Sequence, residues 1–97
     1  MKTTNEYIDI LRRYKETKTA EYGIISIGIF GSVARGTHTE NSDIDICVIL
    51  EKPSIFRMVH IKEELQELTG VNVDIVRLRD SMDSILKRDI KRDCIYV

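Results

Sequence analysis

The stretch GSVARGTHTENSDIDICVIL, residues 31–50, joins a Gly-Ser turn to two aspartates inside what reads as a buried strand. Ten residues separate the Gly-Ser pair from Asp43, and Asp45 follows after one apolar residue. Alternation of side chains predicts a strand over 43–50 with its isoleucines and valine on one face. Asp43, Asp45 and Cys47 share the other face, so two negative charges stand where a core strand should be apolar.

Carboxylates in a low-dielectric interior are costly unless they are paired, hydrogen-bonded or bound to a metal ion. Asp43 and Asp45 are one residue apart, so their side chains project from the same face of the strand and would repel each other when alone. Together they can hold divalent cations. Oxygen donors favour magnesium, with manganese as the alternative, over zinc.

Gly31 and Ser32 supply the features of a phosphate site upstream of these acids. Gly31 allows a sharp turn and a close approach of the backbone to a ligand, and the Ser32 hydroxyl and the N–H groups of the following turn can donate to phosphate oxygens. Asp74 lies in the next apolar run and is the natural third acid, able to complete a metal site and to receive the proton of an attacking hydroxyl. Phosphate beside metal describes a bound nucleoside triphosphate.

Other interpretations of these motifs remain open at this point. Asp43 and Asp45 could simply begin the strand as turn acids, because Asp-x-Asp alone is a weak pattern. An EF-hand calcium loop does not fit, since Cys47 and Val48 stand where an oxygen ligand and a glycine should follow. A Walker P-loop does not fit either, because no Gly-Lys-Ser/Thr follows the first predicted strand.

Helical and strand patterns alternate along the chain. The predicted elements are a helix from Thr3 or Thr4 to just before Gly23, a strand over 24–30 covered on both faces, a helical turn over 32–35 ended by Gly36, the strand over 43–50, a helix capped by Ser54 and closed by Gly70, a strand over 71–78, and a last helix from about Ser81. The order α-β-α-β-α-β-α predicts the α/β (α+β) class, a small sheet packed with helices.

Length and charge limit the functions that this chain can have. With 97 residues we expect one domain over 1–97, and the net charge of −1 argues against nucleic acid as a partner. No run approaches the roughly 18 apolar residues of a membrane span, and the polar N-terminus lacks a signal peptide's apolar region. We therefore expect a cytoplasmic protein with no membrane contact. Cys47 and Cys94 have no metal-ligand spacing, and we expect reduced thiols.

Taken together, these motifs resemble the nucleotidyltransferase superfamily that includes DNA polymerase beta, and most closely its minimal nucleotidyltransferase (MNT) domains. The segments GSVARG and SDIDICV carry the resemblance, which extends from Ile24 through the last helix. It implies a mixed sheet of the nucleotidyltransferase fold. It also implies that Asp43, Asp45 and Asp74 are the catalytic carboxylates that hold two magnesium ions, and that Gly31 and Ser32 hold the triphosphate.

Three more polar residues lie in the same region. Arg35 falls in the family's Ala-Arg-Gly segment, and could neutralise phosphate or anchor the loop by pairing with an acid such as Asp43 or Glu40. Ser42 could touch phosphate, although we favour a cap of the loop. His38 is expected to be a solvated loop histidine, because no partner is in view.

The resemblance implies transfer of a nucleoside monophosphate, most simply AMP from ATP, to a hydroxyl. MNT domains commonly accompany a HEPN-domain toxin as its antitoxin and can AMPylate a tyrosine of that partner, so the resemblance implies a HEPN-domain partner here. A partner could also bury the apolar C-terminus, Cys94 to Val97. The alternatives are a non-catalytic antitoxin that acts by occlusion, and an enzyme that transfers to a small molecule or to RNA.

Overall fold

The computed structural model describes residues 1–97 as four helices and four strands. The elements are α1 (Thr4–Tyr22), β1 (Ile24–Phe30), α2 (Gly31–Arg35), β2 (Ile44–Leu50), α3 (Ile55–Thr69), β3 (Val73–Arg77), α4 (Ser84–Asp93) and β4 (Ile95–Tyr96). None of the helices combines the length and the apolar character needed to cross a membrane. The predicted class and the order of the first seven elements are confirmed.

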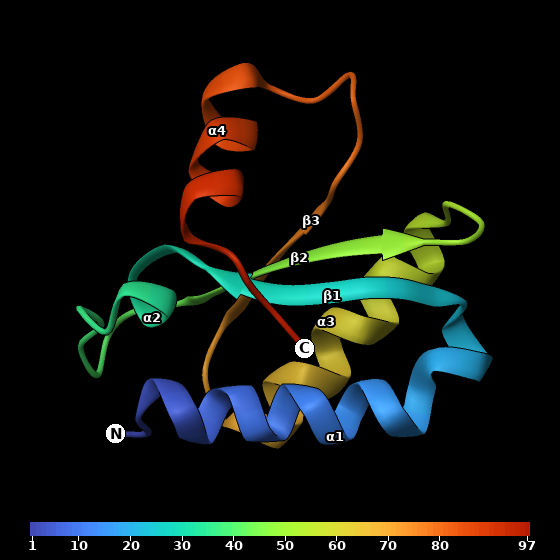
Figure 1. Ribbon diagram of the computed structural model, residues 1–97. Coiled ribbons are helices and arrows are strands. Elements are labelled where there is room, and N and C mark those ends of the chain that lie inside the picture. The colour runs from blue at the N-terminus through green and yellow to red at the C-terminus, as the bar shows by residue number, and fades with distance from the viewer.

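The four strands form one mixed sheet in the order β3-β2-β1-β4. β1 pairs antiparallel with β2 on one side and with β4 on the other, whereas β2 and β3 are parallel. Parallel neighbours need a crossover, and α3 supplies it. The parallel pair brings the starts of β2 and β3 to the same edge of the sheet, the edge near α2 (Figure 1).

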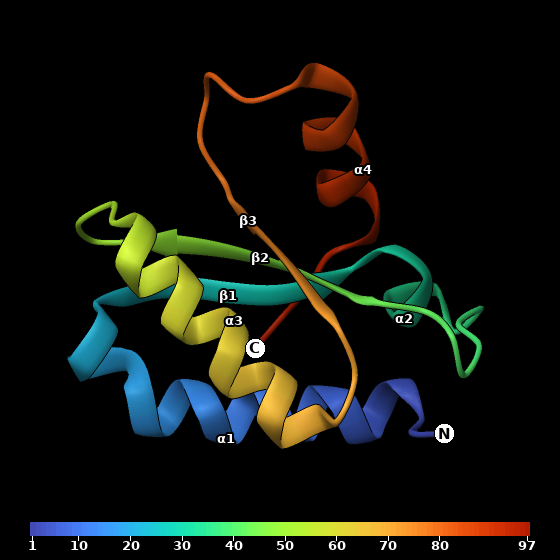
Figure 2. The ribbon, with the colours of Figure 1, turned by 180° about the vertical axis from the view of Figure 1, so that it is seen from behind.

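The helices form layers on both faces of this sheet. α1 and α3 lie against one face and α4 stands over the other, as the front and back views show (Figures 1 and 2). The larger core lies on the α1 and α3 side and includes the buried side chains of Ile44, Ile46 and Val48 from β2. A smaller cluster of Phe30, Cys47, Met82 and Ile90 packs on the α4 side. The predicted division of the two faces of β2 is therefore confirmed.

Local capping explains where the long helices begin and end. The Thr3 hydroxyl accepts from the Glu6 N–H, and the Glu6 carboxylate accepts from the Thr3 N–H, which makes a capping box at the start of α1. Ser54 caps α3 in the same way by accepting from the Arg57 N–H. Gly23 ends α1 in the left-handed conformation, with φ of 64°. These boundaries match those expected from the sequence.

The C-terminal quarter departs from the sequence-based prediction. The third strand is shorter than 71–78. The last helix begins at Ser84 because the Asp83 carboxylate accepts from the N–H groups of Ile85 and Leu86. A fourth strand was missed: Ile95 and Tyr96 pair with β1, and the Val97 N–H donates to the Ile27 carbonyl at 3.1 Å. The apolar C-terminus, which a partner could have buried, is therefore paired within the chain itself, although Tyr96 stays 47% exposed.

Replacing Ile61 with alanine should lower the free energy of unfolding by about 2–5 kcal/mol, because its side chain is fully buried between α3 and the sheet. Ile55→Ala on the same helix is the control. Its side chain is 75% exposed, so it should change stability by no more than about 0.5 kcal/mol. Urea denaturation of both variants measures the difference, and equal losses would contradict the packing described here.

Candidate active site

The acids predicted to form a site meet at the edge of the sheet where β2 and β3 begin. Asp45 of β2 is the direct register partner of Asp74 of β3, so both side chains leave the same face of adjacent strands. Asp43 lies two residues before Asp45, just ahead of the first residue of β2. This face is the α4 side of the sheet, opposite the larger core. The tertiary structure therefore places Asp74 beside Asp45, with Asp43 on the same edge of the sheet just ahead of β2.

Gly31 lies directly against the Asp45 carboxylate. Its φ of 73° is in the left-handed region, and a Cβ placed on it would overlap the Asp45 carboxylate oxygen and lie 3.0 Å from the carboxyl carbon. Glycine is therefore required at position 31 for two reasons, the left-handed backbone conformation and the space that a Cβ would occupy. The backbone of the β1–α2 turn, which carries the predicted phosphate-binding residues, consequently touches the carboxylate cluster.

The helical turn α2 continues this arrangement. Phe30 at its N-cap offers no side-chain hydrogen bond to the first turn, and Gly36 ends the turn with φ of 74°. The Ser32 carbonyl accepts from the Thr37 N–H at 2.9 Å, which fixes Ser32 at the start of the turn beside Gly31. The expected short helix between Ser32 and Gly36 is confirmed, one residue longer at its N-terminal end.

The cluster is electrostatically unfavourable when no cation neutralises it. Partial burial raises the pKa of Asp45 above its ordinary value, and the negative charges of Asp74 and then Asp43 raise it further, while Arg35 opposes them. A carboxyl with this environment resists ionisation. Asp43 and Asp74 are exposed, and Asp45 is partly buried.

The donor chemistry of the three carboxylates fits a hard divalent cation, because it offers only oxygen ligands. No group of three or more His, Cys, Asp or Glu side chains is already drawn together as a metal cluster. The backbone register nonetheless places Asp45 and Asp74 side by side, and Asp43 is near enough for its charge to act on Asp45. A bound cation would turn this repulsion into attraction. Asp43, Asp45 and Asp74 are therefore the residues that could hold magnesium or manganese.

An open hollow of about 520 Å³ adjoins Asp43, the one acid of the three that lines it. The loop residues Glu40, Asn41, Ser42 and Asp43 line one side, and the end of α3 with the turn that follows lines the other. Four polar side chains from one loop thus face a space that begins at Asp43. This hollow offers room for a polar ligand next to the carboxylate cluster.

Arg35 and Ser42 are engaged by the protein itself. Arg35 Nη1 donates to Asp93 Oδ2 at 2.8 Å, so the acid that anchors it comes from α4 and is neither Asp43 nor Glu40. Nothing in the sequence indicated Asp93, which lies 58 residues away. The Ser42 hydroxyl accepts from the Thr39 N–H at 2.9 Å, which confirms the expected cap of the loop. A nucleotide-binding role for either residue stays a prediction.

His38 differs from the expectation of a solvated side chain. Its Nε2 lies 2.8 Å from the Lys2 carbonyl oxygen, its ring meets Tyr7 edge to face, and its Nδ1 is buried without a hydrogen-bond partner. The ring ties the loop after α2 to the start of α1. The signal that could have revealed this contact is absent from the local sequence, because the residues are far apart in the chain.

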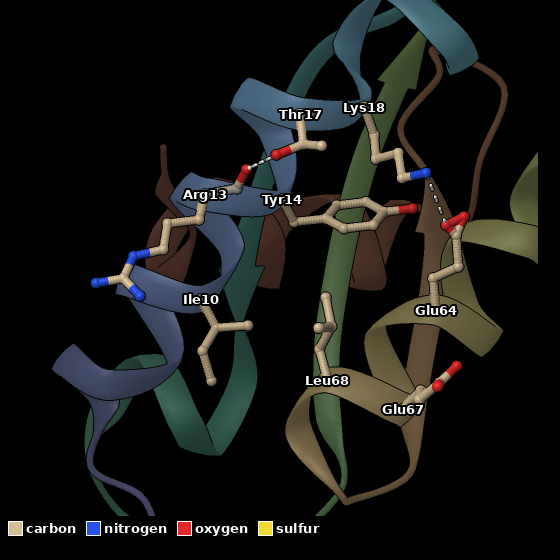
Figure 3. A pocket seen from close by; sticks show the side chains of 8 residues that line it. All are labelled: Ile10, Arg13, Tyr14, Thr17, Lys18, Glu64, Glu67 and Leu68. Atoms are coloured by element: carbon tan, nitrogen blue, oxygen red, sulfur yellow. Dashed lines mark hydrogen bonds and ion pairs between the residues drawn. The ribbon is translucent and has the colours of Figure 1, made fainter.

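A second cavity lies away from the acids, between α1 and α3. This cleft of about 490 Å³ is shown in Figure 3. Tyr14 extends across it, and Lys18 and Glu64 form an ion pair at 3.8 Å at its rim. It lies on the opposite side of the sheet from Asp45 and contains none of the predicted site residues. The carboxylate cluster is accordingly the better candidate for the functional site.

Fold and site together define the class of protein. The mixed sheet, the Gly-Ser turn and the three adjacent carboxylates are the features expected of a nucleotidyltransferase. The chain belongs to the nucleotidyltransferase domain family, whose family model matches residues 8–97. The resemblance seen in the GSVARG and SDIDICV segments is thereby confirmed, and the chain is an enzyme of the minimal nucleotidyltransferase type.

Individual relatives extend this assignment. The protein adenylyltransferase MntA of Thermococcus cleftensis is 36% identical over 98 residues, covering 100% of this chain and 98% of that protein. A solved structure of a candidate minimal nucleotidyltransferase is 30% identical, with a TM-score of 0.77, over 97% of this chain and 95% of that one. A toxin–antitoxin complex solved with AMP-PNP contains a chain that is 26% identical, with a TM-score of 0.70. The match covers 96% of this chain and 70% of that one.

Replacing Asp45 with asparagine should raise the stability of the protein at neutral pH. The pKa of Asp45 is raised in the folded state, so ionising this carboxyl opposes folding. The advantage of the variant should be absent below the unfolded-state pKa of about 3.9, and complete above the raised folded-state pKa. Thermal denaturation between acid and neutral pH, without divalent cations, measures it. A variant that is less stable than the wild type at pH 7 would contradict this electrostatic account.

Replacing Gly31 with alanine should displace the Asp45 carboxylate and weaken binding of manganese by about tenfold or more. Gly70→Ala is a matched control. Gly70 has a similar φ of 74°, against 73° for Gly31, but no atom lies within 4 Å of the added Cβ. Both variants should lose about 1–2 kcal/mol of stability from the backbone conformation. Electron paramagnetic resonance of free manganese separates them, and equal affinities in the two variants would contradict the predicted contact.

Proposed function

We propose that this protein transfers AMP from ATP to a hydroxyl group, and that the acceptor is a tyrosine of a HEPN-domain toxin for which this chain is the antitoxin. One observation carries the catalytic part of the proposal: the register places Asp45 opposite Asp74, with Gly31 in contact with Asp45. Three carboxylates beside a glycine turn suit a triphosphate and its divalent cations, and no other cluster in the chain combines these features.

Each carboxylate has a distinct part in the proposed reaction. Asp43 and Asp45, with Asp74, would hold two magnesium ions, which when bound neutralise the triphosphate and stabilise the charge of an in-line displacement. The acceptor oxygen attacks the α-phosphorus, and the bond from that phosphorus to the bridging oxygen breaks, so that pyrophosphate leaves. Asp74 accepts the proton of the hydroxyl. Manganese satisfies the same oxygen donors.

The residues of the β1–α2 turn and of the following loop would position the phosphates. Gly31 allows close approach of the backbone, and the Ser32 hydroxyl can donate to a phosphate oxygen. Arg35 is about half exposed and can reorient from Asp93 toward a phosphate, because its guanidinium makes only part of its possible hydrogen bonds there. Ser42 lines the hollow beside Asp43 and could donate to the nucleotide there.

The choice of AMP and of a protein acceptor rests on the relatives. A protein 36% identical over this whole chain is a protein adenylyltransferase, and a structurally similar chain belongs to a toxin–antitoxin complex that contains AMP-PNP. The HEPN identity of the partner is the implication of the sequence resemblance. These relatives support ATP as the donor and a toxin as the acceptor.

The test is incubation with α-labelled ATP and magnesium, with and without the protein encoded by the adjacent gene. Asp43→Asn and Asp74→Asn should each reduce label on the partner by at least about a hundredfold. Asp80→Asn is the control, because Asp80 is a fully exposed aspartate whose only ion pair is with Lys87 on the surface. Mass spectrometry then locates AMP on the partner.

The outcomes separate the candidate functions. Label on a partner tyrosine that is lost in Asp43→Asn and Asp74→Asn, but kept in Asp80→Asn, supports the proposal. Equal labelling by all variants would overturn the assignment of the carboxylates. Tight binding of the partner with no label from any nucleoside triphosphate would instead favour an antitoxin that acts by occlusion.

A further inference from the structure

The two cysteines of the chain lie in contact although 47 residues separate them. Cys47 is in the middle of β2 and only 1% exposed, whereas Cys94 follows the last residue of α4 and is partly exposed. Their Sγ atoms are 2.9 Å apart, and both are present as free thiols. A disulfide bond is about 2.05 Å long, so the sulfur atoms need to approach by less than about 1 Å to form one.

The sheet is built to admit this pair. Gly28 of β1 is the register partner of both Cys47 and Tyr96, so it lies between the two neighbouring strands at the level of the thiols. A Cβ on Gly28 would be 2.6 Å from the Cys94 sulfur and 2.7 Å from the Ile95 carbonyl oxygen. Any larger residue would therefore push Cys94 away, because only glycine leaves the space in which its sulfur sits.

Both cysteines are held in place by their neighbours. The Cys94 N–H donates to the Ile90 carbonyl at 2.8 Å, and Ile95 pairs with Ile29 of β1 immediately afterwards. Cys47 is fixed by its place in the central strand β2, where it packs with Phe30 in the smaller core cluster. The backbone at each cysteine is therefore held by hydrogen bonds, and this keeps the two thiols in contact.

We propose that Cys47 and Cys94 form a reversible intramolecular disulfide when the protein is exposed to a peroxide. This inference is independent of nucleotidyl transfer. The oxidant must be small, because Cys47 is only 1% exposed. Cys94 is partly exposed and is the more accessible of the two residues. The bridge would be reversed by a dithiol reductant.

The reaction balances with hydrogen peroxide as the oxidant. One of the two sulfurs, as its thiolate, attacks one peroxide oxygen and the O–O bond breaks. The hydroxide that leaves takes up the proton released by that thiol and becomes water, and the attacked cysteine is now a sulfenic acid. The second thiol then attacks the sulfur of the sulfenic acid, and its proton leaves with the displaced hydroxyl group as the second water. Two thiols and one peroxide thus give one disulfide and two water molecules. The two protein sulfurs lose two electrons, and the peroxide gains them.

The bridge would join two parts of the molecule that meet at the candidate site. Cys47 is two residues beyond Asp45 on the same face of β2, and Cys94 follows Asp93, the residue that pairs with Arg35 of α2. A covalent link between them would close a long loop and restrict the unfolded chain. The oxidised protein should therefore be more stable than the reduced protein while keeping the same fold.

The test begins with the reduced full-length protein, treated with a small excess of hydrogen peroxide, quenched with iodoacetamide and digested with trypsin. Cleavage after arginine, with the Lys52–Pro53 bond resistant, places Cys47 in a peptide of residues 36–57 and Cys94 in a peptide of residues 93–97. We expect these two peptides to be recovered as one cross-linked species that a dithiol separates. The melting temperature of the oxidised protein should rise by about 10 °C or more.

Matched variants distinguish this bridge from general oxidation. Cys94→Ser and Cys47→Ser should each abolish the cross-linked species, and Gly28→Ala should slow its formation while leaving both thiols in the chain. Circular dichroism checks that each variant is folded, and the result on the wild type stands without them. Recovery of both thiols fully alkylated after peroxide, or of disulfide-linked dimers in place of the 36–57 and 93–97 species, would overturn the proposal.

Discussion

β2 and β3 run parallel, and their register decides which side chains can meet at the site. Ile44, Ile46 and Val48 fill the core beneath α1 and α3, so a shift of one residue would expose all three and bury the acids in their place. Hydrophobic burial on one face thereby determines the positions of the polar groups on the other. Asp45 stands opposite Asp74 because the apolar residues around them have no better arrangement.

The position of the acids lowers the stability of the folded protein, and other interactions in the fold offset this loss. Burial and like charge raise the pKa of Asp45. The positive charge of Arg35 lowers it in part, but Arg35 forms its ion pair with Asp93 and not with Asp45. Such arrangements are typical of functional sites, where binding of a ligand relieves an unfavourable interaction in the free protein. The compensation comes from the larger core on the opposite face of the sheet and from well-capped helices such as α1 and α3.

The C-terminal segment connects the second face of the sheet to this site. β4 adds to β1 at the position of Gly28, where the absence of a side chain lets Cys94 and Tyr96 lie close to the strand. The preceding helix α4 supplies Asp93, which holds Arg35 of the turn that carries Gly31 and Ser32. The last fifteen residues therefore help to position a motif that lies about sixty residues earlier, through contacts that have no counterpart in the local sequence.

The sequence by itself determined the order of the first seven elements and the division of β2 into an apolar and an acidic face, and it predicted the three carboxylates as the candidate site. These properties depend on residue types at short spacing, on glycines at helix ends and on alternation along a strand, which local physics controls. Tertiary structure alone decided that Asp45 faces Asp74, that Asp93 holds Arg35, that His38 packs on Tyr7, and that Cys47 meets Cys94. Each of these pairs joins distant segments, and their meeting depends on how the whole apolar core packs. The two-residue strand β4 escaped prediction for the same reason, because so short a strand has no pattern of its own and forms only where β1 offers an unpaired edge.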